Sequence, residues 1–140
     1  MTRPIHGDGR VHGVIVGCRR RDGRWLHIRR GPKVVAPGKV CLPGGAVEIG
    51  ESQQEAGIRE LREELGVDVQ MDACVWHHVY DDKPLTLWCW LGGLLSDELR
   101  PDPLEVAETM WLSVQETRGR SDTLPHHDQI ITALCTAGGV

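Results

Sequence analysis

The segment from residue 42 to 67 constrains the fold of this chain more than any other stretch. It begins with the turn-forming run Leu-Pro-Gly-Gly and continues into one short helix, which we predict from about Ser52 to Leu65. Ser52 and Glu55 have the spacing of a capping box, and Gly66 is a typical helix stop. The sequence therefore predicts a tight glycine turn that leads directly into a helix.

This predicted helix carries a cluster of carboxylates on one side. Glu60, Glu63 and Glu64 stand at positions i, i+3 and i+4, so their side chains share a helix face. Like charges that close repel one another and destabilise the helix unless a cation compensates them. Mg²⁺ prefers oxygen ligands and bridges to substrate phosphates, and Mn²⁺ suits the same ligands. The cluster therefore predicts a divalent-metal site that acts on a phosphorylated substrate.

The same residues match a known pattern, G-x5-E-x7-R-E-U-x-E-E-x-G-U, in which U is an apolar residue. The match runs from Gly45 to Val67, and every specified position is filled. The segment thus resembles the Nudix box of the Nudix hydrolase family. The resemblance implies an α+β Nudix fold, an α/β/α sandwich with a mixed central sheet, formed by residues 1–140 as a single domain.

The resemblance also implies roles for the residues of the box. The metal ligands it implies are three glutamates and one backbone carbonyl: Glu60, Glu63, Glu64 and Gly45. Arg59 resembles the box arginine that pairs with the first box glutamate, here Glu51, and so ties the loop to the helix. The expected catalytic set consists of Glu51, Arg59, Glu60, Glu63 and Glu64. The general base is left open between a box glutamate and an acid outside the box.

A further metal-binding acid is expected before the strand near Trp111, as in MutT-type members of the family. Glu105 and Glu108 are both candidates, and counting back from Trp111 favours Glu105. Positive charge for the phosphates is expected from Arg30, whose spacing to Leu42 resembles a substrate-contacting arginine of MutT-type enzymes. Its neighbour Arg29 is a second candidate.

Candidates for base recognition lie on one predicted strand and in the C-terminal tail. Trp88 and Trp90 share one face of a strand, where they either stack on a base or belong to the core. The tail TLPHHDQIITAL resembles the MutT-type tail in which an asparagine reads the purine. This chain has His127 and Asp128 there and no asparagine. The departure argues against specificity for oxidised guanine. Asp128 has the alternative role of a helix cap.

The remaining segments predict strands around this helix and one further helix. Asp22-Gly23 is a hairpin signal between the first two strands, and Pro125 opens the last helix. The expected strands are 11–19, 25–29, 39–42, 73–80, 85–94 and 109–112, and the last helix is 126–137.

Composition bounds the class of protein. A chain of 140 residues is expected to form one domain, and its net charge of −4 argues against binding a nucleic-acid polymer. No apolar run has the length of a membrane span, and the first residues lack the apolar region of a signal peptide. The five cysteines contain no CxxC pair, which favours reduced cysteines in a cytoplasmic protein. The sequence leaves the oligomeric state open, with a homodimer as one alternative, since many members of the family are dimers.

The predicted function is therefore divalent-metal-dependent hydrolysis of a nucleoside diphosphate linked to another group. A MutT-like reaction, which converts a (d)NTP to (d)NMP and pyrophosphate with Mg²⁺ or Mn²⁺, is the favoured form. A nucleotide sugar, ADP-ribose, a dinucleoside polyphosphate or a coenzyme is the alternative substrate. A non-catalytic binding module of the same fold is the alternative from a different class.

Overall fold

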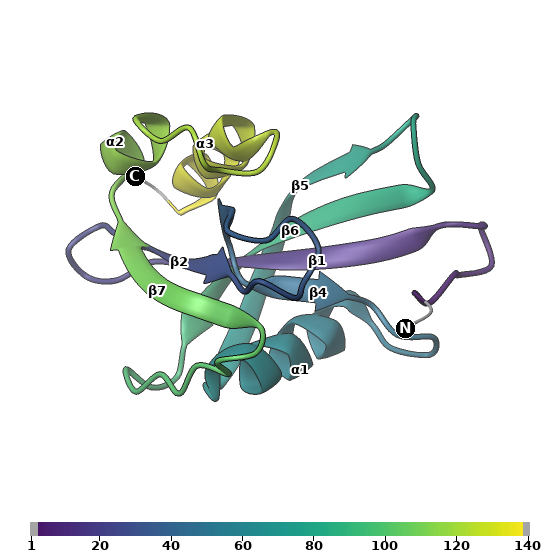
Figure 1. Cartoon of the computed structure of the whole chain (residues 1–140), viewed down its shortest axis with the longest axis horizontal. Helices are drawn as coiled ribbons and strands as arrows, with labels where there is room; N and C mark the ends of the chain where they lie inside the picture. The colour runs from purple at the N-terminus through teal and green to yellow at the C-terminus, as the bar shows by residue number, and fades with distance from the viewer. Residues whose placement is uncertain (1–2, 139–140) are drawn as a thin grey trace.

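The computed structural model describes residues 3–138, which form two β-sheets and three helices (Figure 1). In chain order the elements are β1 (Val11–Cys18), β2 (Trp25–Arg30), β3 (Val40–Cys41), β4 (Gly44–Ala46), α1 (Gln53–Leu65), β5 (Val69–Val79), β6 (Leu85–Leu94), β7 (Val106–Leu112), α2 (Val114–Arg118) and α3 (His127–Ala137).

The larger sheet is mixed, with the strand order β4-β1-β6-β5. Its central strands β1 and β6 run parallel, whereas β4 and β5 pair antiparallel at the two edges. The smaller sheet, in the order β3-β2-β7, is antiparallel throughout. The strand expected at 85–94 has those bounds, while β5 and β7 begin earlier than predicted. The predicted mixed sheet is confirmed.

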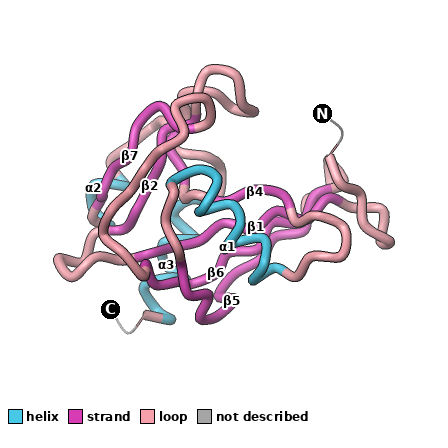
Figure 2. Tube along the Cα trace, turned by 90° about the horizontal axis from the view of Figure 1, so that it is seen from below, coloured by secondary structure: helices cyan, strands magenta, loops and turns pink. Residues whose placement is uncertain are grey.

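A helix packs on each face of the larger sheet, which gives the predicted sandwich. Helix α1 lies across one face (Figure 2), and α3 lies against the other, where it contacts β5 and β6. The core accordingly divides in two. Leu61 and Leu65 of α1 belong to one cluster, and Ile131 and Leu134 of α3 belong to the other.

Local sequence signals explain the bounds of α1. Ser52 accepts a hydrogen bond from the backbone of Glu55, whose side chain accepts one in return, so the predicted capping box is present. Gly66 ends the helix with φ 60°, a left-handed conformation that glycine adopts without strain. The caps fix where α1 starts and stops, and with it the positions of its glutamates.

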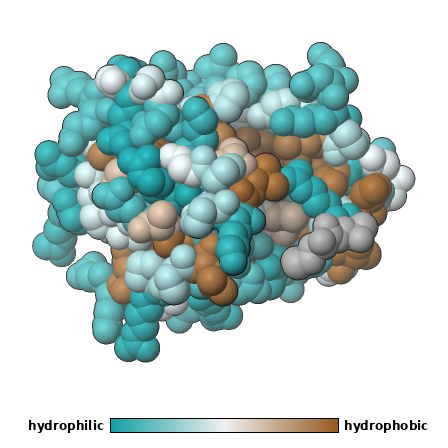
Figure 3. Space-filling view, in the orientation of Figure 1, coloured by the Kyte–Doolittle hydropathy of each residue, from teal (hydrophilic) through white to brown (hydrophobic). Residues whose placement is uncertain are grey.

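Hydrophobic residues also show on the surface of the molecule. In Figure 3 they gather right of centre, where Figure 1 places β1 and β6 beside α3, and most of the surrounding face is hydrophilic. Between residues 3 and 138, no helix is both long and apolar enough to cross a membrane.

Candidate active site

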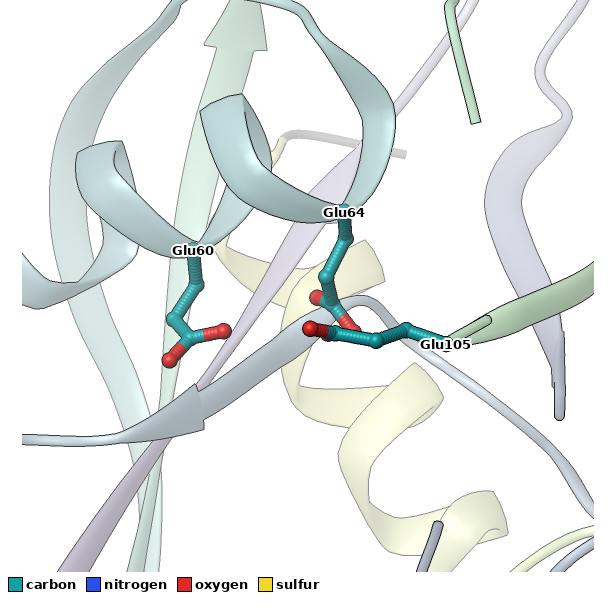
Figure 4. Close-up of side chains that lie close together, drawn as sticks. All are labelled: Glu60, Glu64 and Glu105. Atoms are coloured by element: carbon teal, nitrogen blue, oxygen red, sulfur yellow. The ribbon is translucent and has the colours of Figure 1, made fainter. Parts of the chain in front are cut away.

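Three carboxylates from two separate parts of the chain converge beside α1 (Figure 4). Glu60 and Glu64 point from successive turns of the helix, and Glu105 reaches them from the residue before β7. One oxygen of each side chain lies within 4.8 Å of the corresponding atoms of the other two. We refer to Glu60, Glu64 and Glu105 as the acidic cluster.

Backbone hydrogen bonds hold the segment before β7 against α1. The amide of Asp102 donates to the carbonyl of Glu64 at 2.8 Å, and the amide of Arg100 donates to the carbonyl of Leu65 at 2.6 Å. On the other side, the amide of Gly31 donates to the carbonyl of Glu105 at 2.9 Å. Glu105 is therefore fixed relative to the helix by main-chain contacts on both sides, although it lies outside the box.

The glycine turn completes the wall of the acidic cluster. The amide of Gly44 donates a hydrogen bond of 2.9 Å to a carboxylate oxygen of Glu64. A Cβ atom at Gly45 would lie 2.4–2.6 Å from the carboxyl atoms of Glu60, so only glycine lets this carboxylate lie against the backbone. The carbonyl of Gly45 thus belongs to a strand segment in contact with the cluster.

Arg59 links the loop before α1 to the helix. Its Nε and one terminal nitrogen donate to the two oxygens of Glu51 at 2.8 and 3.0 Å, which is a bidentate ion pair. It also donates to Glu60 at 2.9 Å and to the carbonyl of Ala46 at 2.8 Å. The ion pair holds the pKa of Glu51 below its usual value, so Glu51 stays ionised while it anchors the loop.

Electrostatics distinguish the three acids of the cluster. Burial and the neighbouring Glu60 raise the pKa of Glu64 to about 8, while Gly44 and Arg30 oppose the shift. Burial also raises the pKa of Glu60 and of Glu105. Burial thus disfavours the charged form of all three acids, and a bound cation would offset this effect.

Of the two predicted arginines, only Arg30 faces the acidic cluster. It lies close enough to lower the pKa of both Glu64 and Glu105, and its guanidinium is held by the carbonyl of Val35 and by Cys41 Sγ at 3.8 Å. Arg29 projects to the other side of β2, because successive residues of a strand alternate in direction. There it forms ion pairs with Glu108 and Asp122, each at 3.2 Å.

Glu63 is a box glutamate that the structure does not bring into the cluster. Its side chain is 51% exposed and contacts Arg59 at 3.3 Å. Glu108, the alternative to Glu105, is engaged by Arg29. The set that converges is therefore Glu60, Glu64 and Glu105, whereas the box pattern alone points to Glu60, Glu63 and Glu64.

Trp88 and Trp90 pack on the side of the sheet that α1 covers. The indole nitrogen of Trp88 donates to His12 Nδ1 at 3.0 Å, and its ring stacks on His77 with the centroids 4.9 Å apart. Trp90 donates to the side chain of Gln53 at 2.7 Å. Neither set of contacts involves the acidic cluster, and the role of Trp88 in stacking on a base stays a prediction.

The start of α3 differs from the expectation for Asp128. His126, with φ 68°, is the N-cap residue and makes no side-chain cap hydrogen bond, while Asp128 lies inside the first turn. The prediction that Asp128 caps the helix is therefore wrong, because the chain enters α3 through a left-handed residue two positions earlier. His127 is buried, and its Nε2 lies 3.0 Å from Nε2 of His27.

His27 was not singled out in the sequence. It occupies an inward-facing position of β2, where a polar residue breaks the apolar pattern of its neighbours. That break was its only signal. Its partner lies one hundred residues away, and no local pattern identifies such a contact.

The donor set of the acidic cluster fits a hard divalent cation. All of its side-chain ligands are carboxylate oxygens, which Mg²⁺ and Mn²⁺ prefer, and the cluster offers neither histidine nor cysteine. Raised pKa values of buried acids agree with this fit, since a bound cation would compensate the charge that burial disfavours.

Known proteins resemble this chain in sequence. The 8-oxo-dGTP diphosphatase of Escherichia coli (strain K12) is 35% identical over 81 residues, which is 56% of this chain and 63% of that protein. The CTP pyrophosphohydrolase of the same organism is 38% identical over 65 residues, 46% of this chain and 48% of that protein. The chain thus spans less than two thirds of the length of these curated relatives.

The fold has solved counterparts as well. The MutT protein from Methanosarcina mazei Go1 superposes with a TM-score of 0.77 at 22% identity, covering 100% of this chain and 99% of the other. The sequence profile described as NUDIX domain matches residues 9–134, which include both the box and Glu105. On this match over most of its length, the chain belongs to the Nudix family.

Proposed function

We propose that this protein is a divalent-metal-dependent pyrophosphohydrolase that converts a (d)NTP to (d)NMP and pyrophosphate. The observation that carries the proposal is the convergence of Glu60, Glu64 and Glu105 from two separate elements. Acids gathered at the cost of raised pKa values are typical of a functional site. When bound, Mg²⁺ or Mn²⁺ neutralises phosphate charge and lowers the pKa of a water that attacks phosphorus.

The side chains of the box take the following roles in the proposal. Glu60, Glu64 and Glu105 hold the cation, together with the carbonyl of Gly45. Glu63 lies beside the cluster, where its charge acts on Glu60 and Glu105, and its exposed side chain suits contact with a cation on the solvent side. Arg59 and Glu51 are positioning residues, because their ion pair holds the loop before α1 against the first half of the helix. The general base is one of the acids of the cluster or Glu63.

Substrate binding requires positive charge beside the cluster. Arg30 supplies it in the proposal, because it is the arginine that faces Glu64 and Glu105. Arg29 is held in ion pairs with Glu108 and Asp122, so we assign it no phosphate contact. The two relatives named above act on 8-oxo-dGTP and on CTP, which supports a nucleoside triphosphate as the substrate class.

The proposal treats the chain as one domain that works in the cytoplasm on a small molecule. The free thiols of Cys18, Cys41 and Cys89 are buried, as suits a reducing compartment. A homodimer, and the absence of membrane or nucleic-acid partners, stay predictions from the sequence.

A release assay for phosphate and pyrophosphate tests the proposal. The panel contains canonical and oxidised (d)NTPs, ADP-ribose, nucleotide sugars, dinucleoside polyphosphates and coenzyme A, each with Mg²⁺, with Mn²⁺ and with EDTA. We expect metal-dependent turnover of a (d)NTP to monophosphate and pyrophosphate, and a loss of about a hundredfold or more in Glu64→Gln.

Four results would contradict all or part of the proposal. Turnover that persists in EDTA, or that is undiminished in folded Glu64→Gln, would remove the acidic cluster from the reaction. Selective turnover of a nucleotide sugar or ADP-ribose would retain the metal chemistry and replace the substrate class. A folded protein that binds metal but hydrolyses nothing in the panel would favour a binding module.

A further inference from the structure

The loop between β2 and β3, residues 31–39, is held closed by the backbone of Arg30. The amide of Arg30 donates to the carbonyl of Lys39 at 2.8 Å, and its carbonyl accepts from the amide of Gly38 at 2.9 Å. These hydrogen bonds continue the antiparallel pairing of β2 with β3. The loop therefore leaves and re-enters the smaller sheet at fixed points.

The side chain of Arg30 also turns back onto this loop. Its Nε donates to the carbonyl of Val35, and one terminal nitrogen contacts Sγ of Cys41 at 3.8 Å. The side chain of Val35 is 62% exposed, so the backbone of this residue, rather than its side chain, holds Arg30. The guanidinium is thus held at Nε and at one terminal nitrogen.

This arrangement leaves the other terminal nitrogen of Arg30 available to a ligand. Both of its hydrogens can donate, and among residues 3–138 it has no hydrogen-bond partner. A guanidinium is planar and rigid, so fixing two of its nitrogens also fixes the direction of the third. The direction of this free donor is therefore set before any ligand binds.

Backbone contacts place Arg30 beside the acidic cluster. Arg30 pairs with Val106 of β7, which follows Glu105 directly. The amide of the next residue, Gly31, donates to the carbonyl of Glu105 at 2.9 Å. The charge of Arg30 opposes the rise in pKa that burial causes at Glu64 and Glu105. The loop thus begins directly against the segment that supplies a carboxylate of the cluster.

Ala36 has an unusual backbone conformation next to the carbonyl that holds Arg30. Its φ is 53°, in the left-handed region that residues with a Cβ atom rarely adopt. The peptide group of the Val35 carbonyl ends at the nitrogen of Ala36, so the direction of this carbonyl and φ of Ala36 change together. Strain of this kind persists where the surrounding structure determines it, and it is common at ligand sites.

We propose that the carbonyl of Val35, held in place by the left-handed conformation of Ala36, orients the guanidinium of Arg30 so that its free terminal nitrogen binds a phosphate group of the substrate. Val35 and Ala36 are then positioning residues that act through Arg30. The phosphate contact rests on the proposed function, whereas the hydrogen bond between Arg30 and Val35 does not depend on any activity.

Nitrogen-15 NMR of the arginine side chains tests the positioning claim directly. The Nε–H of Arg30, assigned by the loss of its signal in Arg30→Lys, should exchange with water more slowly than that of the exposed Arg100. Ala36→Pro, which forces φ to about −65°, should accelerate this exchange about tenfold or more. Ala36→Gly adopts the left-handed conformation without strain and should keep it slow. Fast exchange in the native protein, or an unchanged rate in Ala36→Pro, would overturn the proposal.

Ala36→Val is a second variant in case Ala36→Pro does not fold. A β-branched side chain disfavours the left-handed region strongly, so the exchange of the Arg30 Nε–H should again accelerate, by a smaller factor. Within the described part of the chain the amide of Ala36 donates no hydrogen bond, so neither variant removes one from the loop. Native exchange in Ala36→Val would count against the role of Ala36.

Steady-state kinetics with the (d)NTP that the protein hydrolyses tests the phosphate contact. Ala36→Pro should raise KM about tenfold, as for one weakened charge-assisted hydrogen bond, with kcat within about threefold. Arg30→Ala should raise KM at least as much, and adding Ala36→Pro to it should change KM no further, because Ala36 acts through Arg30. Ala36→Gly should rescue the native KM.

The kinetic outcomes separate positioning from a purely structural role. Additive effects of Arg30→Ala and Ala36→Pro, or the same rise in KM in Ala36→Gly, would assign the loop a structural role only. If no (d)NTP is hydrolysed, the proposed function fails in that form, and inorganic pyrophosphate with Mg²⁺ is the probe. A shift of the Arg30 Nε–H signal, with weaker affinity in Ala36→Pro, supports the inference. No shift, or equal affinity in both proteins, overturns it.

Discussion

Gly45 has no side chain, and its neighbours leave no space for one. The carboxyl group of Glu60 occupies the volume that a Cβ atom would need, at 2.4–2.6 Å. The same turn supplies the amide of Gly44 to Glu64, so two residues without side chains shape one wall of the acidic cluster. The two glycines are therefore as necessary to the geometry of the site as its acids.

Gly45→Ala should therefore displace Glu60 and misplace a metal ligand while the fold persists. We expect kcat/KM to fall by about a hundredfold, the effect of a displacement near 1 Å in a site of this kind. Steady-state kinetics measures the loss of kcat/KM, and circular dichroism shows whether the fold persists. Gly7→Ala is the matched control, since no atom lies within 4 Å of its added Cβ. Equal activity of both variants would contradict this role for Gly45.

Residues whose contacts are local were predictable, and those whose contacts are distant were not. The ion pair of Arg59 with Glu51 was expected, because both residues belong to one continuous pattern. The displacement of Glu63 from the cluster was not, since i+3 and i+4 positions look alike until the neighbouring backbone is known. The distance of Arg29 from the site follows from strand alternation together with the direction of Arg30, which only the structure provides.

Helix α1 is the element that sets the spacing of the site. It carries Glu60 and Glu64 one turn apart, with Leu61 and Leu65 buried beneath them. Its start is fixed by the capping box of Ser52 and its end by Gly66. The two ends of α1 therefore fix the positions of both glutamates.

Ser52→Ala should lower stability with little effect on turnover. Loss of the capping hydrogen bonds costs about 1 kcal/mol, while the Arg59–Glu51 ion pair still anchors the first half of the helix. Urea unfolding followed by tryptophan fluorescence measures the change. Ser121→Ala, at an exposed position, is the control. A large loss of turnover under conditions where Ser52→Ala is fully folded would show that the cap serves the site itself.

Most elements were predictable, and the two that were missed had weak signals for different reasons. Strand β4, at Gly44–Ala46, is short and glycine-rich, and only its pairing with β1 makes it a strand. Helix α2, at Val114–Arg118, did have a signal: Ser113 and Glu116 form a second capping box. Tertiary pairing decides the first case, and an overlooked local pattern explains the second.

The whole molecule places its two polar centres in different layers. The acidic cluster lies between α1 and the start of β7, whereas the His27–His127 pair lies between β2 and α3. The sandwich and its mixed sheet were predicted from the resemblance of residues 45–67 to the Nudix box, and the predicted strands before and after the box helix agreed with it. The approach of β3 to the segment before α3 was not predicted, since it depends on a single bridge between residues 40 and 123.

Acid should destabilise the fold through His27. Its pKa is about 4 in the folded protein and 6.5 in the reference state, so the unfolded chain binds more protons between these values. The stabilisation is therefore complete above about pH 6.5 and is lost as the pH falls toward 4. We expect a loss of about 1–3 kcal/mol, with His127 contributing in the same direction.

Urea unfolding at pH 7.5 and pH 5.0 measures this dependence. His27→Gln does not titrate at that position, so its free energy of unfolding should fall less between the two pH values than that of the native protein. The same decrease in both proteins would mean that His27 is not the titrating group.

A Mn²⁺ titration followed by electron paramagnetic resonance tests most directly whether the acidic cluster is a metal centre. The native protein should bind the ion, and Glu64→Gln should bind it about tenfold or more weakly, a loss of about 1.4 kcal/mol or more. Glu98→Gln, which changes an exposed acid paired with Arg100, should bind as the native protein does. Equal affinity in all three proteins, or no binding to the native one, would contradict the metal site on which the proposed reaction depends.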